Sequence, residues 1–276
     1  MMPSGGRKTW IWNATVFIFF IKRDDKLIER VKPLIELAER GPFVVVDDYR
    51  EANIIVSIGD DGAFLQAVRQ TGFLPDRLYV GVSVLPARGF YCDFHIDDID
   101  HMVEAAKNWK LEVRRYPIIE VTIDGAASFF CLNECSIRSQ IIKTMAIDVF
   151  IDDLHFETFR GDGIIVSTPT GSTGYNKSVH GAVVDPLLPC FQVSELASLN
   201  SNRYRTLGSP FILSGSRTLT LKMSEETSHF PIIGLDNEAL SIQHIERIDI
   251  RLSDRVVKTV RLKDNSFWDK VKRVFL

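Results

Sequence analysis

The sequence predicts an α/β domain built on a parallel sheet, followed by an all-β sandwich. Residues 14–110 alternate between short apolar runs and segments with helical spacing, which is typical of a parallel sheet covered by helices. From residue 111 the pattern changes to short β-branched runs separated by turns such as Asp124-Gly125, which is typical of antiparallel sheets. We therefore expect three segments: a Rossmann-like α/β domain over 14–110, a β-sandwich over 111–255, and a C-terminal segment, 256–276, that packs back on the first domain.

The first domain should contain helices between its strands. Leu27, Val31 and Ala38 recur at helical spacing, and Pro33 should kink that helix. A second helix should follow the third strand and end near Gly72, and a third is predicted around 102–109. The expected strands are 15–21, 43–46, 53–58 and 79–84.

The second domain should be almost entirely strands. A helix is conceivable only around 190–199, inside a longer connection. The tail places Phe267, Val271, Val274 and Phe275 on one helical face, which predicts a docking helix or a subunit contact. The expected strands are 111–123, 128–138, 144–151, 154–159, 163–168, 211–213, 217–222, 230–233, 239–242 and 247–252.

Composition is that of an ordinary globular protein, with a formal net charge of −3. This balance argues against broad nucleic-acid binding. The apolar run 16–21 is too short to span a bilayer and lacks a cleavage site after it, so we predict a buried strand and no membrane association. The cysteines, Cys92, Cys131, Cys135 and Cys190, lack zinc-ribbon spacing; we expect buried, reduced thiols and a cytoplasmic protein.

A glycine- and aspartate-rich turn between a strand and a helix is the first candidate site. The apolar strand 54–58 runs into Gly59-Asp60-Asp61-Gly62, and a helix follows at once. Glycines let the backbone approach a ligand, and the helix N-terminus suits phosphate. An aspartate there opposes anion binding unless it has a separate task, such as accepting a proton or holding a metal. Asp61 is therefore the first candidate catalytic residue.

A loop rich in hydroxyls and glycines is the second candidate. The apolar strand that begins at Gly163 is followed by the segment Ser167-Thr168-Pro169-Thr170-Gly171-Ser172-Thr173-Gly174-Tyr175. Hydroxyls can bond ribose and phosphate oxygens, and Tyr175 can stack on a base. A turn-rich β loop without a ligand is the alternative.

An amide beside a carboxylate, Asn133-Glu134, interrupts an apolar strand and is the third candidate. Such a pair can read an adenine edge and bind ribose hydroxyls, although buried Asn and Glu are as often satisfied by nearby backbone. Phosphate-binding Gly-x-x-x-x-Gly-Lys-Ser/Thr and nucleophile Gly-x-Ser-x-Gly motifs are absent from the sequence, and its six histidines show no metal-ligand spacing.

Together these segments resemble the NAD kinase family, and in particular its short bacillus-type branch. The family's Gly-Gly-Asp-Gly-Thr turn is matched by Gly59 to Ala63, and its Asn-Glu pair by Asn133-Glu134. Its third motif, Asp-Gly followed by a strand and Ser-Thr-Pro-Thr-Gly-Ser-Thr-Ala-Tyr, is matched by 162–175, with Gly174 for alanine. The resemblance covers nearly everything after residue 14.

The resemblance implies phosphorylation of the adenosine 2′-hydroxyl of NAD to give NADP, with ATP as donor and Mg²⁺ or another divalent metal. Asp61 would be the general base. Asp61 and Gly62 would contact substrate, Asn133 and Glu134 would hold NAD, and Arg160 and Asp162 would lie near ribose and adenine. The remaining pocket residues would be Thr173, Gly174, Tyr175, Asn176, Lys177, Ser178, Ala197 and Asn237. A homo-oligomer, a tetramer or dimer, is also implied.

Two departures from the family turn leave alternatives open. Asp60 replaces a glycine and adds a carboxylate near incoming phosphates, and Ala63 replaces a threonine hydroxyl. One alternative is a non-catalytic NAD(P)-binding regulator that kept the pocket and lost the phosphate turn. Another is a lipid or sugar kinase sharing the Gly-Asp-Gly turn, although neither would need the Asn-Glu pair together with the hydroxyl-rich loop.

Overall fold

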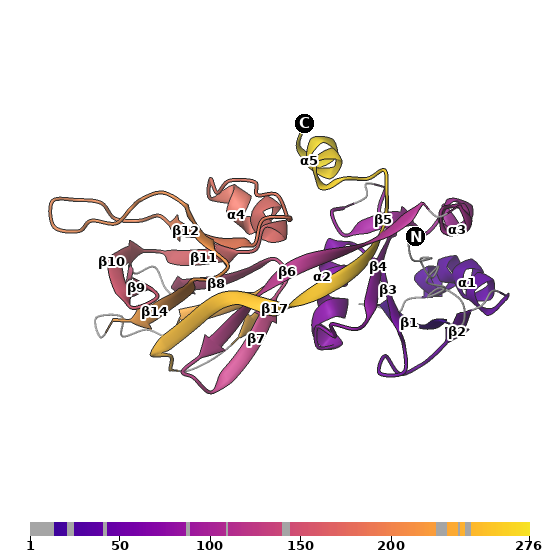
Figure 1. Ribbon diagram of the computed structural model, residues 1–276, viewed down its shortest axis with the longest axis horizontal. Helices are drawn as coiled ribbons and strands as arrows, with labels where there is room; N and C mark the ends of the chain where they lie inside the picture. Colours follow the sequence, from indigo (N-terminus) through magenta and orange to yellow (C-terminus); the bar gives the residue numbers. More distant parts are fainter. Residues whose placement is uncertain are drawn as a thin grey trace, which may run out of the picture. The chain divides into compact units, whose positions relative to one another are not determined.

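The computed structural model forms two compact units, and each is described by itself (Figure 1). Unit 1 comprises Met1–Arg114 and Lys258–Leu276, and unit 2 comprises Arg115–Val257. The domain bounds 14–110, 111–255 and 256–276 stay a prediction. The structure describes residues 14–20, 25–40, 43–86, 89–108, 110–139, 144–224, 231–236, 238–240 and 244–276.

Unit 1 is built on a parallel sheet with the strand order β17–β4–β3–β1–β2. β5 also pairs with β4 in parallel, beside the C-terminal half of that strand. The predicted strands of the first domain are confirmed to within a residue. Their bounds are β1 Ala14–Phe20, β2 Phe43–Val45, β3 Ile54–Gly59, β4 Leu78–Ser83, β5 Cys92–His95 and β17 Arg247–Leu262.

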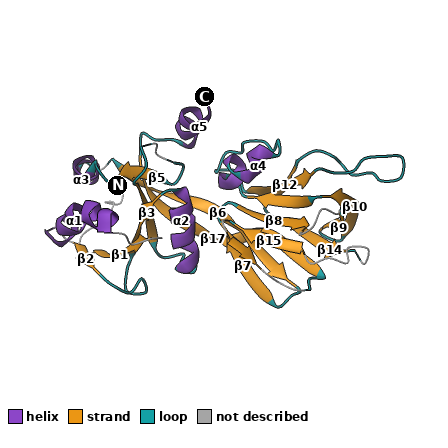
Figure 2. Ribbon diagram, turned by 180° about the vertical axis from the view of Figure 1, so that it is seen from behind, coloured by secondary structure: helices purple, strands orange, loops and turns teal. Residues whose placement is uncertain are grey.

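Helices cover both faces of this sheet, with α2 (Asp61–Gln70) on one face and α1 (Asp25–Arg40) and α3 (Ile99–Lys107) on the other (Figures 1 and 2). Apolar side chains of α1 and α3, such as Val31 and Met102, pack on alternate residues of the strands. α1 runs through Pro33, and Trp109, at the end of the predicted third helix, lies outside the described residues.

The C-terminal helix α5 (Phe267–Phe275) begins at Ser266, whose side chain and that of Asp269 form a capping box. The predicted apolar face is partly wrong. Phe267 is buried, but Val274 is 42% and Phe275 36% exposed. Lys270 is buried instead, because its ammonium group reaches the carboxylate of Asp93.

Unit 2 is a β-sandwich of two sheets whose inner side chains form one core. One sheet contains β10, β9, β14 and the first part of β17, with β6 pairing β17 and β7. The other has the order β13–β12–β11–β8–β15–β16. The bounds are β6 Leu111–Ile123, β7 Ala127–Cys131, β8 Glu134–Ser139, β9 Met145–Ile151, β10 Leu154–Gly161, β11 Gly163–Ser167, β12 Cys190–Leu196, β13 Phe211–Ser214, β14 Thr218–Met223, β15 Pro231–Leu235 and β16 Glu238–Leu240.

The helix considered for 190–199 is wrong, because this segment is strand β12, paired with β11 and β13. Its side chains alternate with period two, as in a strand. Phe191 and Val193 enter the core, whereas Gln192 and Ser194 bond to Ala182 and Asn176 on the other face. The sequence alternates between apolar and polar residues only over 191–194, which is a short signal for a strand.

The cysteine prediction is confirmed: all four thiols are buried and free of disulfides. Among the described residues, no helix is both long enough and apolar enough to cross a membrane.

Candidate active site

The N-terminus of α2 forms at the carboxyl end of β3, where a tight turn brings backbone and helix together. Gly59 has a φ of +154°, and a Cβ at this position would lie 2.5 Å from Cβ of Ala63, so glycine is required. Asp60 is the N-cap, and its carboxylate accepts a hydrogen bond of 2.8 Å from the N–H of Ala63. Asp60 therefore has a structural task at the helix end.

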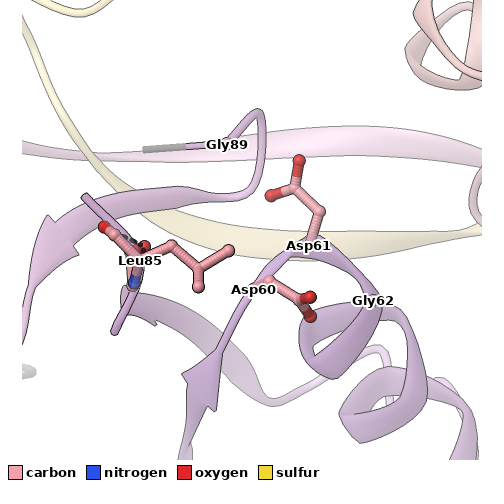
Figure 3. A pocket seen from close by; sticks show the side chains of 6 residues that line it. Asp60, Asp61, Gly62, Leu85 and Gly89 are labelled. Atoms are coloured by element: carbon pink, nitrogen blue, oxygen red, sulfur yellow. Dashed lines mark hydrogen bonds between the residues drawn. The ribbon is translucent and has the colours of Figure 1, made fainter. Parts of the chain in front are cut away.

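The carboxylate of Asp61 points away from that of Asp60, toward the backbone at Gly89 (Figure 3). It accepts hydrogen bonds from the N–H groups of Phe90, at 2.7 Å, and Tyr91, at 2.8 Å. A Cβ on Gly89 would lie 2.3 Å from this carboxylate, so only glycine permits the approach. Burial raises the pKa of Asp61, whereas the two N–H groups and the charge of Arg261 oppose that rise.

A pocket opens beside these carboxylates, lined by Asp60, Asp61, Gly62, Ser83, Leu85 and Gly89 (Figure 3). β3 ends at Gly59 and β4 at Ser83, so the pocket lies at the carboxyl ends of parallel strands, where ligands of open α/β sheets bind. The free N–H groups at the start of α2 suit an anion. The pocket thus combines the N-terminus of a helix with a carboxylate held by two backbone N–H groups.

In unit 2, Asn133 and Glu134 lie in a turn that is fastened by a single carboxylate. Asp236 accepts hydrogen bonds from the N–H groups of Leu132, at 3.0 Å, Asn133, at 2.6 Å, and Glu134, at 3.1 Å. The N–H of Asp236 returns a bond to the carbonyl of Glu134. Sequence reasoning missed this role of Asp236, whose only local signal is an aspartate after a predicted strand.

The side chain of Glu134 is buried, and its Oε2 has no hydrogen-bond partner within the part of the chain that the structure describes. Burial, reinforced by the negative charge of Asp236, raises the pKa of Glu134 to about 8. Oε2 faces Gly174, where a Cβ would come within 3.3 Å of it. A buried acceptor without a partner is the kind of group that a ligand hydroxyl satisfies.

The hydroxyl-rich loop packs directly on the Asn133 turn. It contains the 3₁₀ helix η1 (Thr170–Thr173) and the short helix α4 (Tyr175–Ser178). A Cβ on Gly171 would lie 2.1 Å from the carbonyl oxygen of Asn133, so the contact depends on glycine. The ring of Tyr175 is partly exposed, with the guanidinium of Arg138 5.9 Å from its centre.

Other predicted residues of this loop divide between structural and exposed positions. Asn176 is fully buried; its amide donates to the carbonyls of Ser172 and Ala182, and its oxygen accepts from Ser194. Its side chain therefore holds the loop in shape. The hydroxyl of Thr173 donates to the carbonyl of Thr170, and Lys177 and Ser178 are exposed.

Three further predicted residues lie elsewhere, and a fourth is not among the described residues. The guanidinium of Arg160 lies 4.6 Å from the ring centre of Tyr204. Asp162 is exposed between β10 and β11, and Ala197, after β12, is exposed with a φ of +45°. Asn237 lies outside the described residues.

The structure thus brings the predicted residues together in two groups. Asp61 and Gly62 share the pocket of unit 1, and Asn133, Glu134, Gly171 and Gly174 share one cluster in unit 2. In the described ranges, no group of three or more His, Cys, Asp or Glu side chains is arranged to hold a metal ion.

Comparison with known proteins gives a consistent result. Residues 132–262 match the family model of the ATP-NAD kinase C-terminal domain. The chain is 60% identical to NAD kinase 2 of Bacillus cereus over 261 residues, which cover 94% of this chain and 98% of the relative. It is 62% identical to NAD kinase 2 of Bacillus subtilis over 258 residues, covering 94% and 97%.

Solved structures share the fold at low identity. A yeast NADH kinase complexed with NADH superposes with a TM-score of 0.76 at 16% identity, covering 95% of this chain and 87% of that one. An NAD kinase from Archaeoglobus fulgidus in complex with ATP superposes with a TM-score of 0.72 at 22% identity. The match covers 94% of this chain and 98% of that one. A parallel-sheet unit followed by a β-sandwich is therefore a fold that this chain shares with both solved structures. The chain belongs to the NAD kinase family.

Proposed function

We propose that the protein transfers the γ-phosphoryl group of ATP to the adenosine 2′-hydroxyl of NAD, giving NADP. Family membership at 60% identity over nearly the whole chain supports the reaction class. One observation of this structure carries the proposal furthest. The Asp61 carboxylate is held by two backbone N–H groups beside a helix N-terminus at the carboxyl ends of parallel strands.

Asp61 is assigned the proton transfer. As the phosphoryl group arrives, the 2′-oxygen gives its proton to the Asp61 carboxylate, and the new bond forms to phosphorus while the bond to ADP breaks. The N–H groups of Phe90 and Tyr91 keep the carboxylate oriented. Burial makes it a better base than an exposed aspartate, because it raises the pKa of the group.

We assign binding of the ATP phosphates to the start of α2. The N–H groups of its first turn, such as that of Gly62, and the positive end of its dipole stabilise negative charge. Asp60 opposes part of this stabilisation, because its carboxylate lines the same pocket and occupies the N–H of Ala63 as the helix cap. The cost expected for this departure from the family turn therefore remains.

We assign binding of the dinucleotide to the cluster of unit 2 around Asn133 and Glu134. The buried Oε2 of Glu134 lacks a partner among the described residues and suits a ribose hydroxyl, while Asn133 adds an amide. Tyr175 offers a ring face for a base. The remaining assignments, to Arg160, Asp162, Ala197, Asn237 and the other residues of 173–178, rest on the family resemblance.

A divalent cation such as Mg²⁺ enters with ATP, as part of the nucleotide substrate. Mg²⁺ keeps several waters and is held largely by substrate phosphates in kinases, which agrees with a chain whose described residues form no cluster of metal ligands. It neutralises charge on the transferred phosphate. We also propose that the protein is cytoplasmic and forms a homo-oligomer, either a tetramer or a dimer.

The direct test is product formation from NAD, ATP and MgCl₂, with the phosphate position read by ³¹P NMR. We expect NADP carrying a 2′-phosphate. Parallel reactions with NADH, with polyphosphate as donor, and with diacylglycerol or a sugar as acceptor define the specificity. Tight NAD binding without any turnover would contradict the proposal and favour a non-catalytic NAD(P)-binding regulator.

A further inference from the structure

A buried ionic cluster lies in unit 1, formed by Asp93 on β5, Arg261 on β17 and Lys270 on α5. Each residue is 1% exposed. Arg261 Nη1 lies 3.0 Å from Asp93 Oδ1, and Lys270 Nζ donates to the same oxygen. Two cations face one carboxylate, and the charge of Arg261 also acts on the carboxylate of Asp61. Burying such a charge is costly unless other groups accept it.

Both cations also donate to one backbone carbonyl. The carbonyl oxygen of Phe90 accepts hydrogen bonds from Arg261 Nη1 and from Lys270 Nζ, the latter at 3.0 Å. This carbonyl belongs to the same peptide group as the N–H of Tyr91, which donates to Asp61. Hydrogen bonds in a chain polarise one another, so cations on the carbonyl strengthen the N–H as a donor.

Ring packing fixes the same peptide on α2. The ring of Tyr91 stacks on that of Phe64 with 4.9 Å between centres and 2° between planes. The guanidinium of Arg261 lies 5.9 Å from the centre of the Tyr91 ring. The Phe90–Tyr91 peptide is therefore held on its carbonyl side by two cations. The Tyr91 ring, which follows it, packs on α2, the helix that carries Asp61.

We infer that Arg261 and Lys270 are positioning residues for the phosphoryl transfer, which hold the Asp61 carboxylate in its reactive orientation through the Phe90–Tyr91 peptide. This inference rests on the proposed role of Asp61. It gives the C-terminal helix α5 a task in the reaction. The competing explanation is that the cluster only fastens α5 to the sheet.

Three variants on α5 separate these explanations. Lys270→Met removes the charge at similar length, Lys270→Arg keeps it, and Lys272→Met makes the same change at an exposed position of the same helix. We expect Lys270→Met to lower kcat about 10- to 100-fold, as loss of supporting contacts does, with KM for NAD changed less than about threefold. Lys270→Arg should restore most of kcat, and Lys272→Met should match the unmodified protein.

A double variant tests whether the effect passes through Asp61. Lys270→Met should add little further loss in an Asp61→Asn background, because residues that act as a unit are not additive. Equal losses in both backgrounds would overturn the inference, as would Lys270→Met kinetics identical to those of Lys272→Met. If Asp61→Asn itself kept full turnover, the proposed role of Asp61 would fail first, which distinguishes the two failures.

Lys270→Met could fail to fold, so a measurement on the unmodified protein and Asp61→Asn is needed as well. The amide proton of Tyr91 should resonate downfield in the unmodified protein and move upfield in Asp61→Asn, because it loses a charged acceptor. An ordinary shift that does not respond to this substitution would show that the peptide link is missing and would overturn the inference.

Discussion

Glu134 shows how a single residue can couple substrate binding to stability. Its carboxyl group is buried without a partner for Oε2 among the described residues, and its pKa is raised to about 8. We propose that this group serves a ligand, since burial of an unsatisfied acceptor weakens the folded state.

The raised pKa predicts a specific pH dependence. The folded-state pKa of Glu134 exceeds the ordinary value, so the folded protein binds more protons than the unfolded chain between about pH 4.5 and pH 8. The contribution of Glu134 to the free energy of unfolding should therefore fall by about 2 kcal/mol between roughly pH 6 and pH 8. Glu134→Gln should lack this fall.

Urea unfolding of the unmodified protein and of Glu134→Gln at several pH values checks this prediction. The difference between their free energies of unfolding removes the contribution of the other titrating groups. Parallel pH profiles for the two proteins would contradict it. Glu134→Gln should also bind NAD more weakly, which isothermal calorimetry measures.

Tyr175 is predicted to act through its ring. Replacing it with alanine should weaken nucleotide binding by about 1–2 kcal/mol through lost stacking. Tyr175→Phe keeps the ring and is the matched control, expected to bind nearly as well. If both variants bound NAD and ATP with unchanged affinity, the ring would have no place in either site.

At the scale of elements, two carboxylates fasten turns that carry the candidate site. Asp60 caps α2, and Asp236 fastens the turn between β7 and β8 through three N–H groups. Both turns precede or contain residues assigned to substrate, so their geometry matters for binding as well as for stability.

Two substitutions of Asp60 separate the effect of its capping hydrogen bond from the effect of its negative charge. Asp60→Ala should lower the free energy of unfolding by about 1 kcal/mol, because the N–H of Ala63 loses its acceptor. Asp60→Ser keeps a capping oxygen and should stay close to the unmodified protein. Chemical denaturation of the three proteins measures this; equal stability of Asp60→Ala would mean that the cap contributes nothing.

Asp236→Ala is predicted to destabilise unit 2 by about 2–3 kcal/mol, because three backbone donors lose a charged acceptor. Asp236→Asn keeps one acceptor oxygen and should lose less. NAD affinity should fall in step, since Asn133 and Glu134 lie in the released turn. A stable Asp236→Ala protein with normal NAD affinity would refute this account of the turn.

Local patterns predicted most strands and the glycine-rich turn, because these features repeat over a few residues. They failed at β12, because its apolar–polar alternation covers only residues 191–194 and is not continued on either side. They also could not reveal the pairing of Asp93 with Arg261 and Lys270, which are 168 and 177 residues away in the chain. Contacts of that range depend on the whole fold.

At the scale of the whole molecule, strand β17 belongs to both units. Its first part pairs with β14 in unit 2, and Lys258 and Thr259 pair with β4 in unit 1. The chain thereby returns to unit 1 and supplies Arg261 and Lys270.

The most direct test of the account is the kinetics of Asp61→Asn, which keeps the shape of the side chain and removes the base. We predict that kcat for NADP formation falls about 100-fold or more, within the usual range for loss of a general base, while the dissociation constant for NAD stays within about threefold. A near-normal kcat in a correctly folded Asp61→Asn protein would contradict the account.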